Sequence, residues 1–181
     1  MPSQRTPILL ILGPSGAGKS TVAGWLQTDC NYLWLEIDRF GEGDGIDLAG
    51  LRAEWDAFWL RGDPSGMAAE LRRRASGKVA GVVLSFPSNV VPAPEQIQAA
   101  EKVGITTIVL YGTGAECLDA FLARERLSRR GLDEEHWISN NSVAYARLSG
   151  VAYRRHRLPV FDSGRFRTKE VLIAEVTERA G

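Results

Sequence analysis

Two residue types that often mark a functional site are scarce in this chain. Its 181 residues include two cysteines and two histidines, and none of these four forms the close pairs that metal sites need. Because Cys30 and Cys117 lie far apart, we expect two ordinary thiols in a reducing, cytoplasmic compartment. His136 and His156 are likewise isolated, and we expect them at the surface rather than on a metal.

Long apolar runs and net charge are also missing. No apolar stretch approaches the length of a membrane span, and the short polar segment 1–7 lacks the pattern of a secretion signal. The 22 basic residues balance 22 acidic ones, which gives zero formal charge. A neutral chain offers no general attraction for nucleic acid or anionic lipid. We therefore expect a small molecule as partner, and neither general nucleic-acid binding nor a membrane.

The most informative segment is glycine-rich. Residues 13–20, GPSGAGKS, fit the pattern G-x-x-x-x-G-K-[ST] at every position. Small residues let successive backbone N–H groups point at a polyphosphate, and a helix starting near Gly18 adds the positive end of its dipole. Lys19 supplies a cation for the β- and γ-phosphates, and Ser20 offers a hydroxyl to Mg²⁺.

A chance glycine-rich turn is the alternative explanation. The apolar run 8–12 directly before the loop and the amphipathic segment directly after it argue against chance, because the motif needs a strand and a helix there. The sequence therefore predicts a nucleoside triphosphate site with ATP and Mg²⁺ as cofactors. Its predicted loop contacts are Gly13, Pro14, Ser15, Gly16, Ala17, Gly18, Lys19, Ser20 and Thr21.

Short apolar runs alternate with longer amphipathic stretches, which is typical of strand–helix–strand units around a mainly parallel sheet. The predicted strands are 8–12, 32–38, 79–85, 105–111 and 158–162. Helices are predicted after Asp47 and Asp63, with a break near 61–63, and over 93–102, 115–130, 139–148 and 168–179. The sequence predicts one α/β domain, 1–181, with three α/β/α layers, a five-stranded sheet and a small helical lid.

The ends of the strands are candidate site residues, because open α/β sheets bind ligands beyond that edge. The third strand ends in Ser85 and carries no acid. The second strand ends in Asp38, with Glu36 two residues deeper on the same side. Asp38 is therefore the candidate carboxylate for Mg²⁺ and for orienting an attacking oxygen. From the residues alone, an aspartate that satisfies a turn is an equally good interpretation.

These features in this order resemble the P-loop small-molecule kinases, the group of shikimate, gluconate and adenylate kinases and chloramphenicol phosphotransferase. The likeness rests on the P-loop, on the acidic strand end Ile37-Asp38-Arg39-Phe40 and on a late arginine-rich helix. It spans most of the chain in outline, and only the P-loop is a specific motif. It implies that Asp38 is the base or orienting group near the acceptor hydroxyl and the metal, and that the acceptor binds over about 39–75.

Four arginines lie on the helix predicted over 115–130: Arg124, Arg126, Arg129 and Arg130. This segment looks like the lid of those kinases, which here covers about 124–140. Arginine suits this task because its fork binds phosphate oxygens and keeps its charge when water is expelled. Arg126 and Arg130, four residues apart, share a helix face and are candidate catalytic residues, with Arg124 as a further nucleotide contact. A basic helix end paired with Glu125 or Glu116 is the alternative.

The loop 162–167 follows the fifth predicted strand. The resemblance implies that Gly164 and Arg165 contact the adenine base, although a plain turn explains the segment nearly as well. Tryptophans Trp34, Trp55 and Trp59 surround the acceptor region, either as core residues or as a stacking surface for a ring.

The third strand departs from the shikimate kinase pattern. It lacks the expected glycine pair, and Ser85, Ser88 and Asn89 stand where acceptor contacts are expected.

These observations predict an ATP-dependent kinase that phosphorylates a hydroxyl of a small molecule. Lys19 and the lid arginines would stabilise the γ-phosphoryl group, while Ser20 and Asp38 hold Mg²⁺. A nucleotide-dependent switch that hydrolyses its nucleotide with water is the main alternative, disfavoured by the absence of an acid on the third strand. A nucleic-acid end kinase is a third, disfavoured by the neutral charge. The acceptor itself is not predicted.

Overall fold

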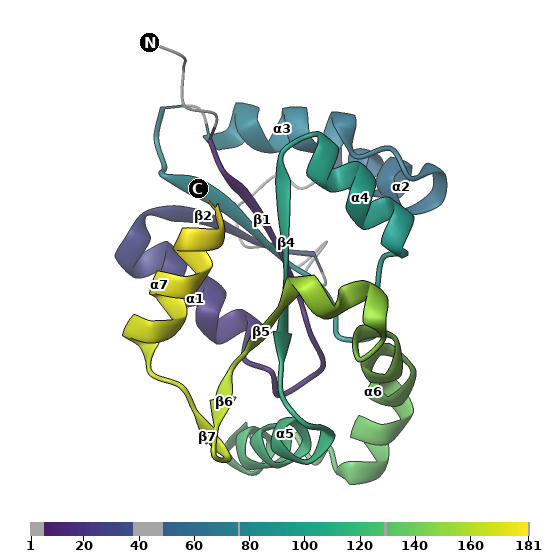
Figure 1. Cartoon of the computed structure of the whole chain (residues 1–181), viewed down its shortest axis with the longest axis vertical. Helices are drawn as coiled ribbons and strands as arrows, with labels where there is room; N and C mark the ends of the chain where they lie inside the picture. Colours follow the sequence, from purple (N-terminus) through teal and green to yellow (C-terminus); the bar gives the residue numbers. More distant parts are fainter. Residues whose placement is uncertain (1–5, 38–48, 76, 129, 181) are drawn as a thin grey trace.

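The structure, a computed structural model, describes residues 6–37, 49–75, 77–128 and 130–180 (Figure 1). Its frame is a parallel sheet in the order β2-β3-β1-β4-β5. The strands are β1 (Ile8–Leu12), β2 (Tyr32–Glu36), β3 (Gly81–Ser85), β4 (Ile105–Tyr111) and β5 (Arg157–Pro159). The chain therefore begins at the centre of the sheet and adds strands on both sides. The predicted five-stranded parallel sheet is confirmed.

Helices cover both faces of this sheet. They are α1 (Lys19–Cys30), α2 (Ala49–Arg61), α3 (Ser65–Ala75), α4 (Pro94–Lys102), α5 (Gly114–Ser128), α6 (Glu134–Leu148) and α7 (Lys169–Ala180), with a 3₁₀ helix at Val151–His156. In Figure 1, α1 and α7 lie on one side of the sheet, and α2, α3 and α4 lie on the other. The predicted three-layer arrangement is confirmed.

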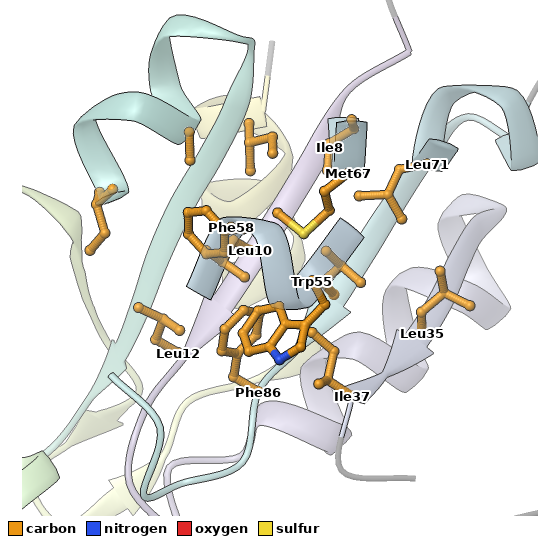
Figure 2. Close-up of a cluster of buried hydrophobic side chains, with 14 of the residues drawn as sticks. Ile8, Leu10, Leu12, Leu35, Ile37, Trp55, Phe58, Met67, Leu71 and Phe86 are labelled. Carbon is orange, nitrogen blue, oxygen red and sulfur yellow. The ribbon is translucent and has the colours of Figure 1, made fainter. Parts of the chain in front are cut away.

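The core lies on both sides of β1, and every residue of that strand is buried. On the side of α2, α3 and α4, Leu10 packs in a cluster with Trp55 and Phe58 (Figure 2). On the opposite side, Leu9 belongs to a cluster with Val176 of α7. A strand that is buried on both faces needs consecutive apolar residues, which explains why the run ILLIL forms the central strand.

Capping residues set the ends of several helices. Asp63 accepts a hydrogen bond from the Ser65 N–H at 2.9 Å, which starts α3 after the predicted break. Asp133 accepts one from the His136 N–H at 3.0 Å, and α6 therefore begins at Glu134 instead of near residue 139. This N-cap adds residues 134–138 to the front of the helix that the sequence predicted from residue 139.

The last predicted strand is divided in two. β5 ends at Pro159, and β6 (Phe161–Asp162) leaves the sheet to pair antiparallel with β7 (Arg165–Phe166). The two turn residues, Ser163 and Gly164, both have positive φ angles, which is the geometry of a tight hairpin turn. His156, just before β5, is buried at 6 % exposure and does not lie at the surface as expected.

Replacing Leu10 with Ala tests the central position of β1. We expect the free energy of unfolding to fall by about 2–5 kcal/mol, because the change leaves a cavity in a fully buried site. Leu60→Ala on α2 is the matched control, since Leu60 is 76 % exposed, and its loss should stay below about 0.5 kcal/mol. Urea denaturation measures both, and equal losses would contradict the assignment of β1 to the core.

Candidate functional site

A cleft of about 850 Å³ opens at the carboxyl edge of the sheet, where the P-loop joins β1 to α1. Segments from the start, the middle and the end of the chain form its walls. The lining residues are Ser15, Gly16, Gly18, Lys19, Ser20, Thr21, Glu36, Phe86, Ser88, Ala120, Ala123, Arg124, Arg130 and Phe166. Most of the predicted loop contacts therefore lie in one cleft.

The backbone of the P-loop runs through closely packed protein. Gly16 and Gly18 have φ angles of 88° and 79°, which side chains other than glycine rarely adopt. A Cβ atom at Gly16 would overlap the backbone of Cys117 in α5, and one at Gly18 would overlap the ring of Phe166. Helix α1 begins directly after Gly18, so its first N–H groups and its positive dipole end face the cleft.

Lys19 links the loop to the end of β3. Its Nζ donates to the carbonyl oxygens of Gly13 at 2.7 Å and Pro14 at 3.2 Å. It also donates to the hydroxyl of Ser88 at 2.8 Å, and Ser15 Oγ donates to the same hydroxyl at 2.9 Å. The ammonium group is therefore held at the mouth of the loop, within reach of a polyphosphate seated there.

Ser20 faces a carboxylate across the cleft. Its Oγ donates to Glu36 Oε1 at 2.8 Å. A hydroxyl and a carboxylate side by side supply the hard oxygen ligands that Mg²⁺ prefers, so these two residues fit a magnesium site. Asp38, the predicted carboxylate, lies outside the described residues.

Two arginines line the cleft opposite the loop, and they differ from the predicted pair. Helix α5 ends at Ser128, so Arg130 follows the helix and does not share a face with Arg126. Arg124 and Arg130 are in the lining of the cleft, whereas Arg126 is exposed and is not among the described lining residues. The prediction that Arg126 and Arg130 share one helix face is therefore wrong, while their catalytic roles stay predictions.

Glu125 joins these two arginines. It is 3 % exposed, and its Oε1 accepts hydrogen bonds from Arg124 Nη2 at 2.9 Å and Arg130 Nη2 at 2.6 Å. Burial alone would raise the pKa of Glu125, but the two guanidinium groups outweigh it and hold the pKa below its ordinary value. The expected pairing of the basic helix end with Glu125 and the expected approach of arginines to the cleft are thus both present.

Comparison with known proteins gives matches in structure alone. No protein-family model matches the sequence, and no curated protein sequence does. A gluconokinase from Sinorhizobium meliloti 1021 is 16 % identical, with a TM-score of 0.54 over 98 % of this chain and 93 % of its own. A shikimate kinase from Acinetobacter baumannii in complex with shikimate is 18 % identical, with a TM-score of 0.52 over 96 % and 92 %. A sugar kinase from Janibacter sp. HTCC2649 is 18 % identical, with a TM-score of 0.52 over 96 % and 93 %.

The chain has the P-loop kinase fold. The resemblance drawn from the sequence is therefore confirmed for the fold, over almost the whole length of the chain. At these identities the likeness establishes the fold and not the acceptor. Within the described ranges, no helix is both long enough and apolar enough to span a bilayer.

In the loop that the resemblance assigns to the adenine base, a residue other than Gly164 and Arg165 lines the cleft. Gly164 and Arg165 are exposed in the β6–β7 turn, and the described lining of the cleft includes neither. Phe166, the next residue, lines the cleft and packs near Trp25, with 6.2 Å between the ring centres. The sequence did contain a signal for Phe166, because it is the aromatic residue near the end of the loop 162–167.

The residues expected to contact an acceptor separate into two groups. Ser88 lines the cleft, whereas Ser85 is 1 % exposed and its hydroxyl accepts a hydrogen bond from Trp34 Nε1 at 2.9 Å inside the sheet. Trp55 is a core residue against Phe86, with 4.3 Å between ring centres. Ser88 therefore stays a candidate, and Ser85 does not.

Cys117 lies behind the P-loop and provides a test of how tightly this region is packed. Burial raises the pKa of Cys117 to about 12, so the thiol stays protonated and unreactive up to about pH 9. A thiol reagent should therefore modify only the half-buried Cys30 in the native chain, and both cysteines after denaturation. In Cys30→Ser, native labelling should be lost. Rapid native labelling of that variant would show that Cys117 is accessible.

Proposed function

We propose that this protein is a kinase that transfers the γ-phosphoryl group of Mg-ATP to a hydroxyl group of a small-molecule acceptor. The observation that carries the proposal is the convergence of Lys19, Arg124 and Arg130 on one cleft with the Ser20–Glu36 pair. The described structural neighbours, a gluconokinase and a shikimate kinase, act on small hydroxyl compounds by their names, which supports the same class of acceptor here.

We assign the cations of the cleft the role of stabilising the phosphoryl group in transfer. Transfer of this kind is mainly positioning and charge neutralisation. Lys19 lines the cleft from the P-loop, and Arg124 and Arg130 line it from α5 and the segment after it. Glu125 uses Nε and Nη2 of Arg124 and Nη2 of Arg130, and a guanidinium has five N–H donors, so donors of each arginine stay available for phosphate oxygens.

Ser20, Glu36 and Asp38 are the proposed metal-binding residues. Mg²⁺ bound there would neutralise charge on the β- and γ-phosphates. The structure describes Ser20 and Glu36, and the hydrogen bond between them keeps the two oxygen atoms next to each other. Asp38 completes the set by its position two residues after Glu36 in the sequence. We assign Asp38 the further role of orienting the acceptor hydroxyl, with the acceptor held over residues 39–75.

The nucleotide base is proposed to lie against Phe166. This ring stands over Gly18 at the start of α1, so a nucleotide with its phosphates in the loop has its base directed along this wall. An aromatic face stacks on a purine ring. This stacking suits any purine nucleotide, and we infer ATP from the likeness to the kinases.

Phosphate transfer from labelled ATP with Mg²⁺ tests the proposed function. The acceptors are sugars, gluconate, shikimate, nucleosides, nucleotides and hydroxylated antibiotics, beside a control without acceptor. A labelled acceptor is the expected result and names the substrate class. Phosphate release that is independent of every acceptor would contradict the proposal and favour a nucleotide-dependent switch.

Lys19→Ala tests the position of the phosphates. We expect turnover to fall by at least about 100-fold, because a preorganised cation at the transferred group is lost. The midpoint of thermal unfolding should change little, since Lys19 is a half-buried residue at the mouth of the loop. Lys78→Ala, at an exposed turn, is the control and should keep full turnover. Full turnover of Lys19→Ala would refute the site.

Arg130→Ala tests which lid arginine reaches the phosphates. We expect kcat to fall by about 100-fold, because a charged donor to the transferred group is removed. Arg126→Ala is the matched control, because Arg126 is exposed on α5 away from the described cleft lining, and its kcat should stay within about threefold. Steady-state kinetics with the acceptor found above measure both. A larger loss for Arg126→Ala would restore the assignment drawn from the sequence.

A further inference from the structure

We propose that helix α6 fixes the conformation of the P-loop through the peptide groups of Ser15, and that Asn141 and Trp137 are therefore positioning residues for nucleotide binding. The inference rests on the proposed function, because it concerns how the same cleft is prepared for its nucleotide. Neither residue lies in the described lining of the cleft.

Both backbone polar groups of Ser15 are bonded to side chains of α6. The Ser15 N–H donates to Asn141 Oδ1 at 2.8 Å, and Trp137 Nε1 donates to the Ser15 carbonyl oxygen at 2.9 Å. Asn141 is 1 % exposed and Trp137 is 6 % exposed, so water does not replace these bonds readily. Two side chains one helical turn apart thus hold a single residue of the loop from both sides.

The orientation of Asn141 is itself fixed. Its Nδ2 donates to the carbonyl oxygen of Trp137 at 3.0 Å, which directs Oδ1 towards the Ser15 N–H. A buried amide with both ends bonded is held in one orientation. Asn141 therefore acts as a rigid acceptor rather than as an adaptable polar contact.

The network continues from Ser15 to the phosphate-binding lysine. Ser15 Oγ donates to Ser88 Oγ, and the same hydroxyl accepts from Lys19 Nζ. Ser15 also precedes Gly16, where a Cβ atom would overlap the backbone of Cys117. A rotation of the Ser15 peptide would thus displace Lys19 or the N–H groups that follow it in the loop. The position of α6 determines whether the loop is ready for phosphate.

The place of α6 in the chain gives this contact a functional meaning. Arg130 lines the cleft, and α6 begins four residues later at Glu134. Helix α6, which carries Asn141 and Trp137, therefore follows directly from the segment that carries Arg130. We call the two hydrogen bonds from Asn141 and Trp137 to Ser15 the clip. The clip joins α6 to the P-loop, so the segment with Arg130 and the P-loop keep a fixed position relative to each other.

Asn141→Leu is the first test, because leucine keeps the approximate shape and removes the acceptor. We expect the Kd for Mg-ATP to rise about tenfold, since the half-buried Ser15 N–H loses its acceptor and the loop conformation that this bond holds is lost with it. Asn140→Leu is the matched control, since Asn140 is exposed on the same helix, and its Kd should stay unchanged. Titrations are made on folded protein, verified by circular dichroism, well below the unfolding temperature.

Two further measurements do not depend on the stability of Asn141→Leu. Trp137→Phe removes the indole N–H and keeps a smaller aromatic ring at the same place, and we expect the Kd for Mg-ATP to rise about threefold to fivefold. Hydrogen exchange of the Ser15 amide in the unmodified protein, without nucleotide, should be slow because that N–H is bonded to a buried acceptor. In steady-state kinetics, both variants should show a higher KM for ATP and an unchanged KM for the acceptor.

The outcomes separate this inference from the proposed function. If the unmodified chain bound no Mg-ATP, the proposed function would fail, and this inference with it. If the unmodified chain bound Mg-ATP and both folded variants bound it equally well, only the positioning role would be overturned, and the clip would be structural. A lower unfolding temperature with an unchanged Kd would overturn the positioning role in the same way, as would fast exchange of the Ser15 amide.

Discussion

The tight packing of the P-loop backbone is the constraint on which the rest of the structure depends. The loop passes between α5 and the β6–β7 hairpin with no space for side chains at Gly16 or Gly18. Glycine at these two positions lets the backbone pass close to its neighbours, with the first turn of α1 beginning at the cleft. Phe166 and Cys117 are therefore part of the site by packing, although neither supplies a charge to it.

A second consequence of this packing is that the charges of the cleft are arranged before a ligand arrives. Lys19 is held by the loop carbonyl groups and Ser88, and Arg124 and Arg130 are held by a buried carboxylate. Such preorganised groups lose little entropy when an anion binds, and they need no reorganisation during transfer. A buried Glu125 is tolerable only because two cations compensate for its desolvation.

Local signals account for the parts of the fold that the sequence predicted. Strand 8–12 matches β1 because a strand buried on both faces needs an unbroken apolar run. Strand 105–111 matches β4, which is mostly buried although Thr106 and Thr107 interrupt its apolar residues. The break before α3 matches because Asp63 and Pro64 act within a few residues. The start of α6 was missed, since the N-cap at Asp133 follows a stretch that looked like a polar loop.

Long-range packing accounts for what was missed in the site. The pairing of Arg124 with Arg130 depends on where α5 ends and on the burial of Glu125, and periodicity along a helix reports neither. The contact of Asn141 with Ser15 joins residues 126 positions apart, and no local pattern marks it. The P-loop motif, in contrast, can be found from the sequence alone, because it is contained in eight consecutive residues.

The most direct test of this account is a titration of the ¹⁵N-labelled protein with Mg-ATP, followed by the amide shifts of the backbone. If the packed loop is the phosphate site, the largest saturable shifts will appear at Gly16, Gly18 and Lys19. The account would be contradicted if these amides stayed unmoved while the shifts gathered elsewhere, for example around the second cavity, of about 720 Å³, beside Trp59 and Tyr153.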